Sequence, residues 1–177
     1  MPADLDTLIN LFYPNPTRLA RFEAVTVQAT PPVYRELLAH TSHMTVAMEE
    51  HHASAVDVHV LDKRVTDSHY ARKILLSRQS DGRMVLYGIV RINFAYVSPE
   101  VEAEIRSETT PLGRVLIEHN VLRRVRLEGL WQVAPGDELC QLLRLPEPHT
   151  TFGRTALIEC NGEPAIELLE IVTPDSY

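Results

Sequence analysis

Two charged residues lie where strand alternation would place apolar side chains. Arg72 shares parity with the apolar residues of segment 70–76, and Glu170 shares parity with those of segment 166–172. Successive side chains of a strand point to opposite faces, so both charges are expected on apolar faces. Burying an unpaired charge is costly, so each residue should meet an opposite charge or a ligand.

Two interpretations of this pattern remain open. In the first, Arg72 and Glu170 pair with each other, or with neighbours such as Arg91, in a structural network. In the second, they line a cavity in which Arg72 binds a carboxylate through two hydrogen bonds and Glu170 bonds a hydroxyl group. The second interpretation makes these two residues the candidate site.

A helix start in the middle of the chain offers a second contact for an anion. Thr110 suits the N-cap position and Pro111 the first helical position, followed by Leu112 and Gly113. The N–H groups of Leu112 and Gly113 would then point out of the helix end, where the dipole favours a carboxylate or phosphate. The alternative is an ordinary capped helix.

Other chemistry has little support. Four of the eight histidines cluster near two glutamates, but the spacing of His40, His43, His51 and His52 matches no zinc pattern, so no metal site is predicted. No nucleophile motif and no glycine-rich phosphate loop occurs. We expect neither a metal nor a cofactor.

The elements that must position these residues follow from hydrophobic periodicity. Helical patterns occur at 3–13, 31–40, 98–105 and 110–117, with a short helical piece over 139–143. Strand patterns occur at 56–60, 70–78, 84–97, 121–133, 152–160 and 164–173. Asp81-Gly82 and Asn161-Gly162 are typical hairpin turns. Residues 22–29 could form a short strand or an extended arm. The pattern predicts an α+β fold, an antiparallel sheet of about six strands with helices on one face.

Composition limits the class of protein. The chain has 177 residues, 45% hydrophobic and 23% charged, which predicts one domain over 1–177, with 1–40 as a helical N-terminal extension. The net charge of −7 argues against nucleic-acid binding. Cys140 and Cys160 are expected as reduced core residues, and no signal peptide or membrane span is evident. A cytoplasmic protein is expected, with its oligomeric state open.

The order of these features resembles the chorismate pyruvate-lyase family, in the broader branch found in mycobacteria and cyanobacteria. The resemblance covers roughly residues 41–177 and lies in motif order: segments 43–45, 70–76, 81–82, 110–114 and 170–174. It implies a single antiparallel sheet with a buried ligand pocket beneath helical flaps. The first 40 residues have little counterpart in the short ubiquinone-pathway enzyme of this family.

The resemblance also implies residue roles. Arg72 would bind the ring carboxylate, Glu170 the 4-hydroxyl end, Leu112 would contribute its backbone N–H, and Met44 would line the site through its backbone. The implied activity is a cofactor-free carbon–oxygen lyase that converts chorismate to 4-hydroxybenzoate and pyruvate. In that reaction Glu170, with a raised pKa, is the candidate acid, and Arg72 orients the substrate.

The same fold also resembles the effector-sensing domains of GntR-type repressors, which bind small molecules without turning them over. The alternative function is therefore a non-enzymatic module that binds an aromatic acid. No helix pair for DNA binding is evident in the first 40 residues. A third reading is a related enzyme of secondary metabolism with a larger substrate.

Overall fold

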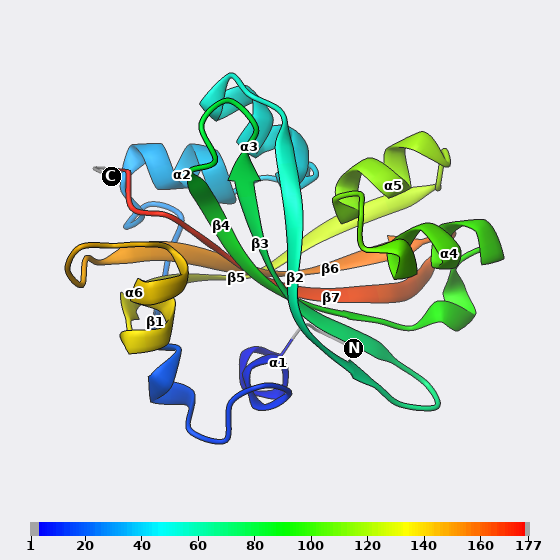
Figure 1. The fold of residues 1–177 in the computed structure, drawn as a ribbon, viewed down its shortest axis with the longest axis horizontal. Helices are drawn as coiled ribbons and strands as arrows, with labels where there is room; N and C mark the ends of the chain where they lie inside the picture. The colour runs from blue at the N-terminus through cyan, green and yellow to red at the C-terminus, as the bar shows by residue number, and fades with distance from the viewer. Residues whose placement is uncertain (1–3, 176–177) are drawn as a thin grey trace.

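The computed structural model describes residues 4–175, which form a seven-stranded antiparallel sheet partly covered by helices (Figure 1). The strand order is β1-β5-β6-β7-β4-β3-β2, and every neighbouring pair is antiparallel. The strands are β1 (Ala20–Val25), β2 (Val56–Val65), β3 (Tyr70–Arg78), β4 (Met84–Ile92), β5 (Arg123–Pro135), β6 (Thr151–Cys160) and β7 (Glu163–Val172). The predicted α+β antiparallel fold is confirmed.

The helices cover both faces of the sheet. They are α1 (Leu5–Asn10), α2 (Pro32–Leu38), α3 (Met44–His52), α4 (Pro99–Ser107), α5 (Leu112–Glu118) and α6 (Asp137–Leu142), with 3-10 turns at Pro16–Arg18 and Phe94–Tyr96. Helices α2 to α5 pack on the face that carries Ile74 and Leu168, in two adjoining apolar clusters. The sequence predicts all helices on one face, whereas the structure places α1 and α6, both expected as helices, on the opposite face.

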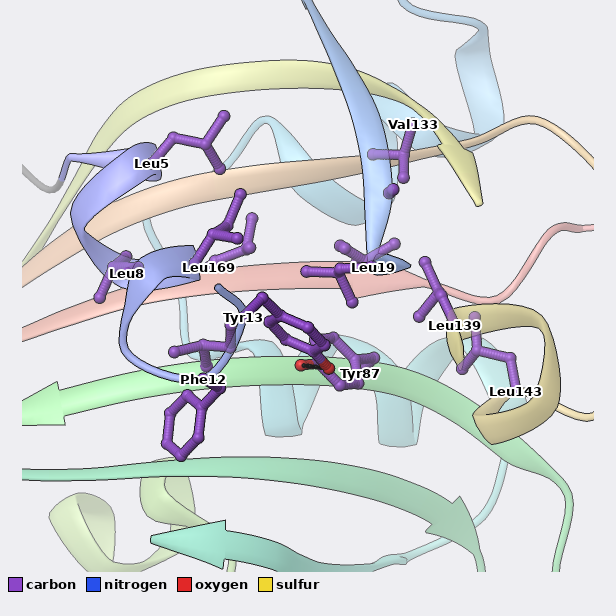
Figure 2. Close-up of a cluster of buried hydrophobic side chains, with 14 of the residues drawn as sticks. Leu5, Leu8, Phe12, Tyr13, Leu19, Tyr87, Val133, Leu139, Leu143 and Leu169 are labelled. Carbon is purple, nitrogen blue, oxygen red and sulfur yellow. Dashed lines mark hydrogen bonds between the residues drawn. The ribbon is translucent and has the colours of Figure 1, made fainter. Parts of the chain in front are cut away.

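The second face is closed by a separate apolar cluster (Figure 2). Leu8 and Tyr13 from the N-terminal segment and Leu139 from α6 pack there against Tyr87 and Leu169 of the sheet. The hydroxyl groups of Tyr13 and Tyr87 lie 2.8 Å apart and share a hydrogen bond. The N-terminal segment therefore closes the core on the face opposite α2 to α5.

The seventh strand is β1, at one edge of the sheet. It pairs with β5 from Ala20↔Pro135 to Val25↔Leu130. Only Ala20 in this strand is buried, and Arg21, Glu23 and Ala24 are exposed, so its hydrophobic alternation is weak. The weak alternation explains why the sequence predicts about six strands and does not distinguish a strand from an extended arm over 22–29.

Turn chemistry sets the register of the strands that carry the site. Asn161 and Gly162 have φ values of 52° and 84°, the positive values that a two-residue hairpin turn of type I′ requires, and they join β6 to β7. The strand predicted over 84–97 ends at Ile92, because the Asn93 side chain accepts from the Ala95 N–H and caps a 3-10 turn.

Within residues 4–175, no helix is long and apolar enough to cross a membrane, and no group of three His, Cys, Asp or Glu side chains could hold a metal ion. Over the same range, Cys140 and Cys160 are both free, and Cys160 is buried. Burial raises the pKa of the Cys160 thiol to about 11.

Candidate functional site

A cavity lies between the sheet and the first residues of α3 and α5. Its empty volume, including the mouth, is about 530 Å³. Most of its wall is apolar: Val58, Ile74, Leu76, Leu86, Val90 and Leu168. Met44, Arg72, Leu112 and Glu170, the residues predicted as the site, all line this one cavity. Their role in binding stays a prediction, but the fold brings the four together.

Arg72 is an almost fully buried cation, with 1% of its surface exposed. Its Nη1 donates to the Ile105 carbonyl at 3.2 Å, while its Nε has no hydrogen-bond partner among residues 4–175. No carboxylate lies within ion-pair distance of Arg72 in the same range. Burial lowers the pKa of Arg72, but an arginine side chain stays charged in proteins. The cavity therefore contains a guanidinium with no carboxylate of the described residues at ion-pair distance, although the more distant charge of Glu108 favours its charged form.

Glu170 is paired, and its partner is Arg154 of β6. Arg154 Nε donates to Glu170 Oε1 at 3.1 Å, and its other nitrogens donate to the carbonyls of His40 at 3.0 Å and Ser42 at 3.3 Å. Burial raises the pKa of Glu170, and the charge of Arg154 opposes that rise. The pairing of Arg72 with Glu170, the first interpretation from sequence, is not what the structure shows.

Strand register separates Arg72 from Glu170. Across β3, β4 and β7, Arg72 is level with Val90 and Leu168, whereas Glu170 is level with Gly88 and Ile74. The two residues are thus two strands apart, about 10 Å, and offset by two residues along the strands, about 7 Å. The Arg72 side of the cavity is therefore cationic, and the Glu170 side holds the ion pair with Arg154.

The roof of the cavity is made where α3 and α5 meet. A Cβ atom on Gly113 would lie 2.9 Å from Thr45 Oγ1 and 3.0 Å from His43 Cβ, so only glycine permits this approach. Arg114 of α5 also forms an ion pair with Glu49 of α3. The sequence predicts the N–H group of Gly113 at a helix end that is open to an anion. In the structure, Gly113 leaves room for α3.

The start of α5 differs from the prediction by one residue. Pro111 takes the N-cap position and Leu112 is the first helical residue, so Thr110 lies outside the helix. Among the described residues, no side chain caps this end. Leu112 is half-buried at the cavity wall, and Met44, with 3% exposed, is the first residue of α3.

Sequence reasoning missed two polar residues of the cavity. Arg154 shares parity with Ala156 and Ile158 in β6, so the rule that selected Arg72 could have found it. His43 has no such signal, because it precedes α3 and reaches the cavity only through the contact with α5. Arg91, named above as a possible partner in a structural network, is ion-paired with Glu167 and lies outside the cavity.

His43 is 7% exposed, and its Nε2 has no hydrogen-bond partner within the part of the chain that the structure describes. Burial, together with the smaller effects of the Arg123 and Arg154 charges, lowers the pKa of His43 to about 4. The imidazole is therefore neutral near pH 7. It can donate or accept one hydrogen bond at the edge of the cavity.

No family model matches the chain, and no curated protein matches it. Solved structures, by contrast, match the chain. The effector domain of PhnF from Mycobacterium smegmatis matches with a TM-score of 0.55 at 11% identity, over 76% of this chain and 90% of that one. The ligand-binding domain of a protein described as a GntR-family regulator from Bordetella bronchiseptica matches with a TM-score of 0.51 at 13% identity, over 68% and 86%.

A longer structure of PhnF from Mycobacterium smegmatis matches with a TM-score of 0.50 at 11% identity. The match covers 76% of this chain but only 64% of that protein. At these identities the matches define the fold, which is the chorismate lyase-like fold of GntR-type effector domains.

These matches correct the prediction of a carbon–oxygen lyase. The matching structures named above are described as an effector domain and as the ligand-binding domain of a transcriptional regulator, and neither is described as a lyase. The catalytic roles predicted for Arg72 and Glu170 are withdrawn with it. The contact of Glu170 with Arg154 gives a physical reason, because the guanidinium stabilises the carboxylate form and so leaves less of the protonated acid that the reaction would need.

Proposed function

We propose that the chain is a small-molecule-binding domain whose cavity holds a compact organic carboxylate, such as an aromatic acid. The observation that carries this proposal is Arg72, buried to 1% exposure without a carboxylate partner among residues 4–175. A buried charge of this kind is costly unless a counter-ion joins it. A ligand carboxylate would supply that counter-ion.

The geometry around Arg72 suits an anion. One nitrogen is already held by the Ile105 carbonyl, which fixes the side chain, and the Nε–H is left for the ligand. Charge-assisted hydrogen bonds from arginine to a carboxylate are roughly twice as strong as neutral ones. The apolar wall beyond Arg72 would then contact the carbon skeleton of the ligand.

The far end of the cavity would distinguish among acids. Glu170 uses one carboxylate oxygen for Arg154, and a carboxylate oxygen can accept further hydrogen bonds. A ligand hydroxyl at the end opposite its carboxylate would find an acceptor there. Leu112 and Met44 would close the site from the starts of α5 and α3.

The names of the matching structures support binding rather than turnover, since they describe a ligand-binding domain and an effector domain. Because the chain spans only part of the longer PhnF structure, the proposal concerns effector binding and carries over no DNA-related role.

Calorimetric titration with 4-hydroxybenzoate and with 4-hydroxybenzamide tests the proposal. The two ligands have similar shapes, but only the first carries the charge that Arg72 would neutralise. We expect the acid to bind and the amide to bind at least about tenfold more weakly. Arg72→Gln should weaken the acid by about 100-fold, whereas Arg64→Gln, at an exposed arginine of β2, should change nothing. Equal binding of acid and amide would contradict the proposal.

A further inference from the structure

An open groove adjoins the cavity and shares one wall with it. The groove has an empty volume of about 870 Å³ and runs between the segment before α3, the end of α5 and the first residues of β5. Its apolar residues are Val46, Ile117, Val121, Leu122 and Val125. Leu122 is 74% exposed, more than the other exposed large apolar residues of the described range.

His43 is the wall that the groove and the cavity have in common. Arg154 lines the cavity and Arg123 lines the groove, and both charges lower the pKa of the same imidazole. The two arginines therefore approach His43 from the two hollows. The buried Nε2 of His43 has no hydrogen-bond partner over residues 4–175, which leaves a polar atom at the boundary for a ligand to contact.

Arg123 is a cation that the described part of the chain leaves without a counter-ion. It is exposed, and its Nη1 donates only to the carbonyl of Val121 at 3.2 Å. Arg126, on the same strand, is by contrast ion-paired with Glu159 and Glu128. In a chain of net charge −7, a free guanidinium beside an apolar groove marks a local site for an anion.

We propose that the groove is a second subsite of the same binding site, and that the ligand is an elongated dianion. One carboxylate lies at Arg72 in the cavity, an apolar body passes His43, and a second acidic group lies at Arg123 in the groove. This inference rests on the proposed function, because it needs the first carboxylate at Arg72. It keeps the carboxylate and apolar part of the ligand in the cavity as proposed, and adds a second acidic group that lies outside the cavity.

Strand register sets the scale of such a ligand. Across the sheet, Arg72 is level with Leu127 of β5, so Arg123 is four strand spacings away, about 19 Å, and four residues further along the strand, about 13 Å. The two backbone positions are thus about 23 Å apart. Both arginine side chains reach into the hollows between these strands, which shortens the path between the charges. An extended chain covers about 1.2 Å per bond, so diacids of roughly eight to twelve carbons should span it.

The test is calorimetric titration with α,ω-dicarboxylates of about six to twelve carbons and with monocarboxylates of equal length. In the wild type, the best diacid should bind at least about tenfold more tightly than its monoacid. Arg123→Gln should remove that preference and leave the monoacid affinity unchanged. Arg124→Gln is the matched control, since it removes the same charge from the next residue, which points to the opposite face of the strand.

The outcomes separate this inference from the proposed function. A wild type that binds monoacids with no preference for any diacid overturns the second subsite alone, and so does an Arg123→Gln variant that keeps the preference. Equal losses in Arg123→Gln and Arg124→Gln would show a general field effect and also overturn it. If no acid binds the wild type, the proposed function fails and the second subsite fails with it.

Discussion

Arg72 and Arg154 are both 1% exposed and lie on the same face of the sheet, but their surroundings differ. Arg154 donates to the Glu170 carboxylate and to two backbone carbonyls, those of His40 and Ser42. Arg72 donates to one carbonyl and keeps an unpartnered Nε within the described residues. The two arginines are therefore equally buried, but only Arg154 has a carboxylate partner within residues 4–175.

The difference separates a structural role from a binding role. Arg154 connects the centre of the sheet to the segment between α2 and α3, so its charge is used within the fold. The charge of Arg72 is not used within the fold. A buried charge of this kind lowers the free energy of unfolding until a ligand binds. Four measurements test this difference between the two arginines.

The largest effect is expected at Arg154. Arg154→Met should lower the free energy of unfolding by about 3–5 kcal/mol, because it leaves the Glu170 carboxylate buried without a partner. Urea denaturation followed by circular dichroism measures this. Arg21→Met, at an exposed arginine of β1, is the control and should change stability by less than about 0.5 kcal/mol. An equally small loss of unfolding free energy in Arg154→Met would show that Arg154 has no structural role.

The next effect isolates the ion pair. Adding Glu170→Gln to Arg154→Met should recover about 1–3 kcal/mol, because the double variant no longer buries an unpaired charge. The four proteins form a double-mutant cycle in urea. Strictly additive losses would mean that Arg154 and Glu170 do not depend on each other.

The third effect is a pH dependence at His43, which lies beside Arg154. The folded pKa of His43 is about 4, below the ordinary 6.5, so the unfolded chain binds the proton more readily. Stability should fall as the pH drops from 6.5 towards 4, with His43 contributing about 2 kcal/mol of that loss by pH 5. His43→Gln should show a smaller loss than the wild type between pH 7 and pH 5. Parallel pH profiles for the two proteins would contradict this.

The smallest effect is expected at Arg72. Arg72→Met should leave the free energy of unfolding unchanged or raise it by about 1 kcal/mol, since it removes an uncompensated charge and loses only the bond to Ile105. The same urea experiment measures it. A loss as large as that of Arg154→Met would show that Arg72 serves the fold.

Strand alternation was sufficient to predict that Arg72 and Glu170 face the apolar side of the sheet. The hairpin at Asn161-Gly162 was equally readable, because its residues favour positive φ. Strand β1 was ambiguous because an exposed edge strand needs little hydrophobic alternation. Arg154 follows the same strand alternation as Arg72, so the same rule predicts that it faces the apolar side of the sheet.

Contacts between distant segments could not be predicted. The partner of Glu170 depends on the pairing of β6 with β7, and parity alone does not distinguish Arg154 from Arg72. His43 reaches the cavity because Gly113 lets α5 approach α3, which no local pattern of either segment encodes. The start of α5 at Leu112 rather than Pro111 is a shift of one residue that turn chemistry did not resolve.

The most direct test of a binding role for Arg72 is the NMR signal of its Nε–H group. Arginine Nε–H resonances of ¹⁵N-labelled protein are assigned with Arg72→Lys and Arg154→Lys variants and followed during titration with 4-hydroxybenzoate. The Arg72 Nε–H should shift in a saturable manner as the carboxylate takes the free donor, while the Arg154 Nε–H, bonded to Glu170, should move much less. An Arg72 signal that does not move while the ligand binds would show that the carboxylate lies elsewhere.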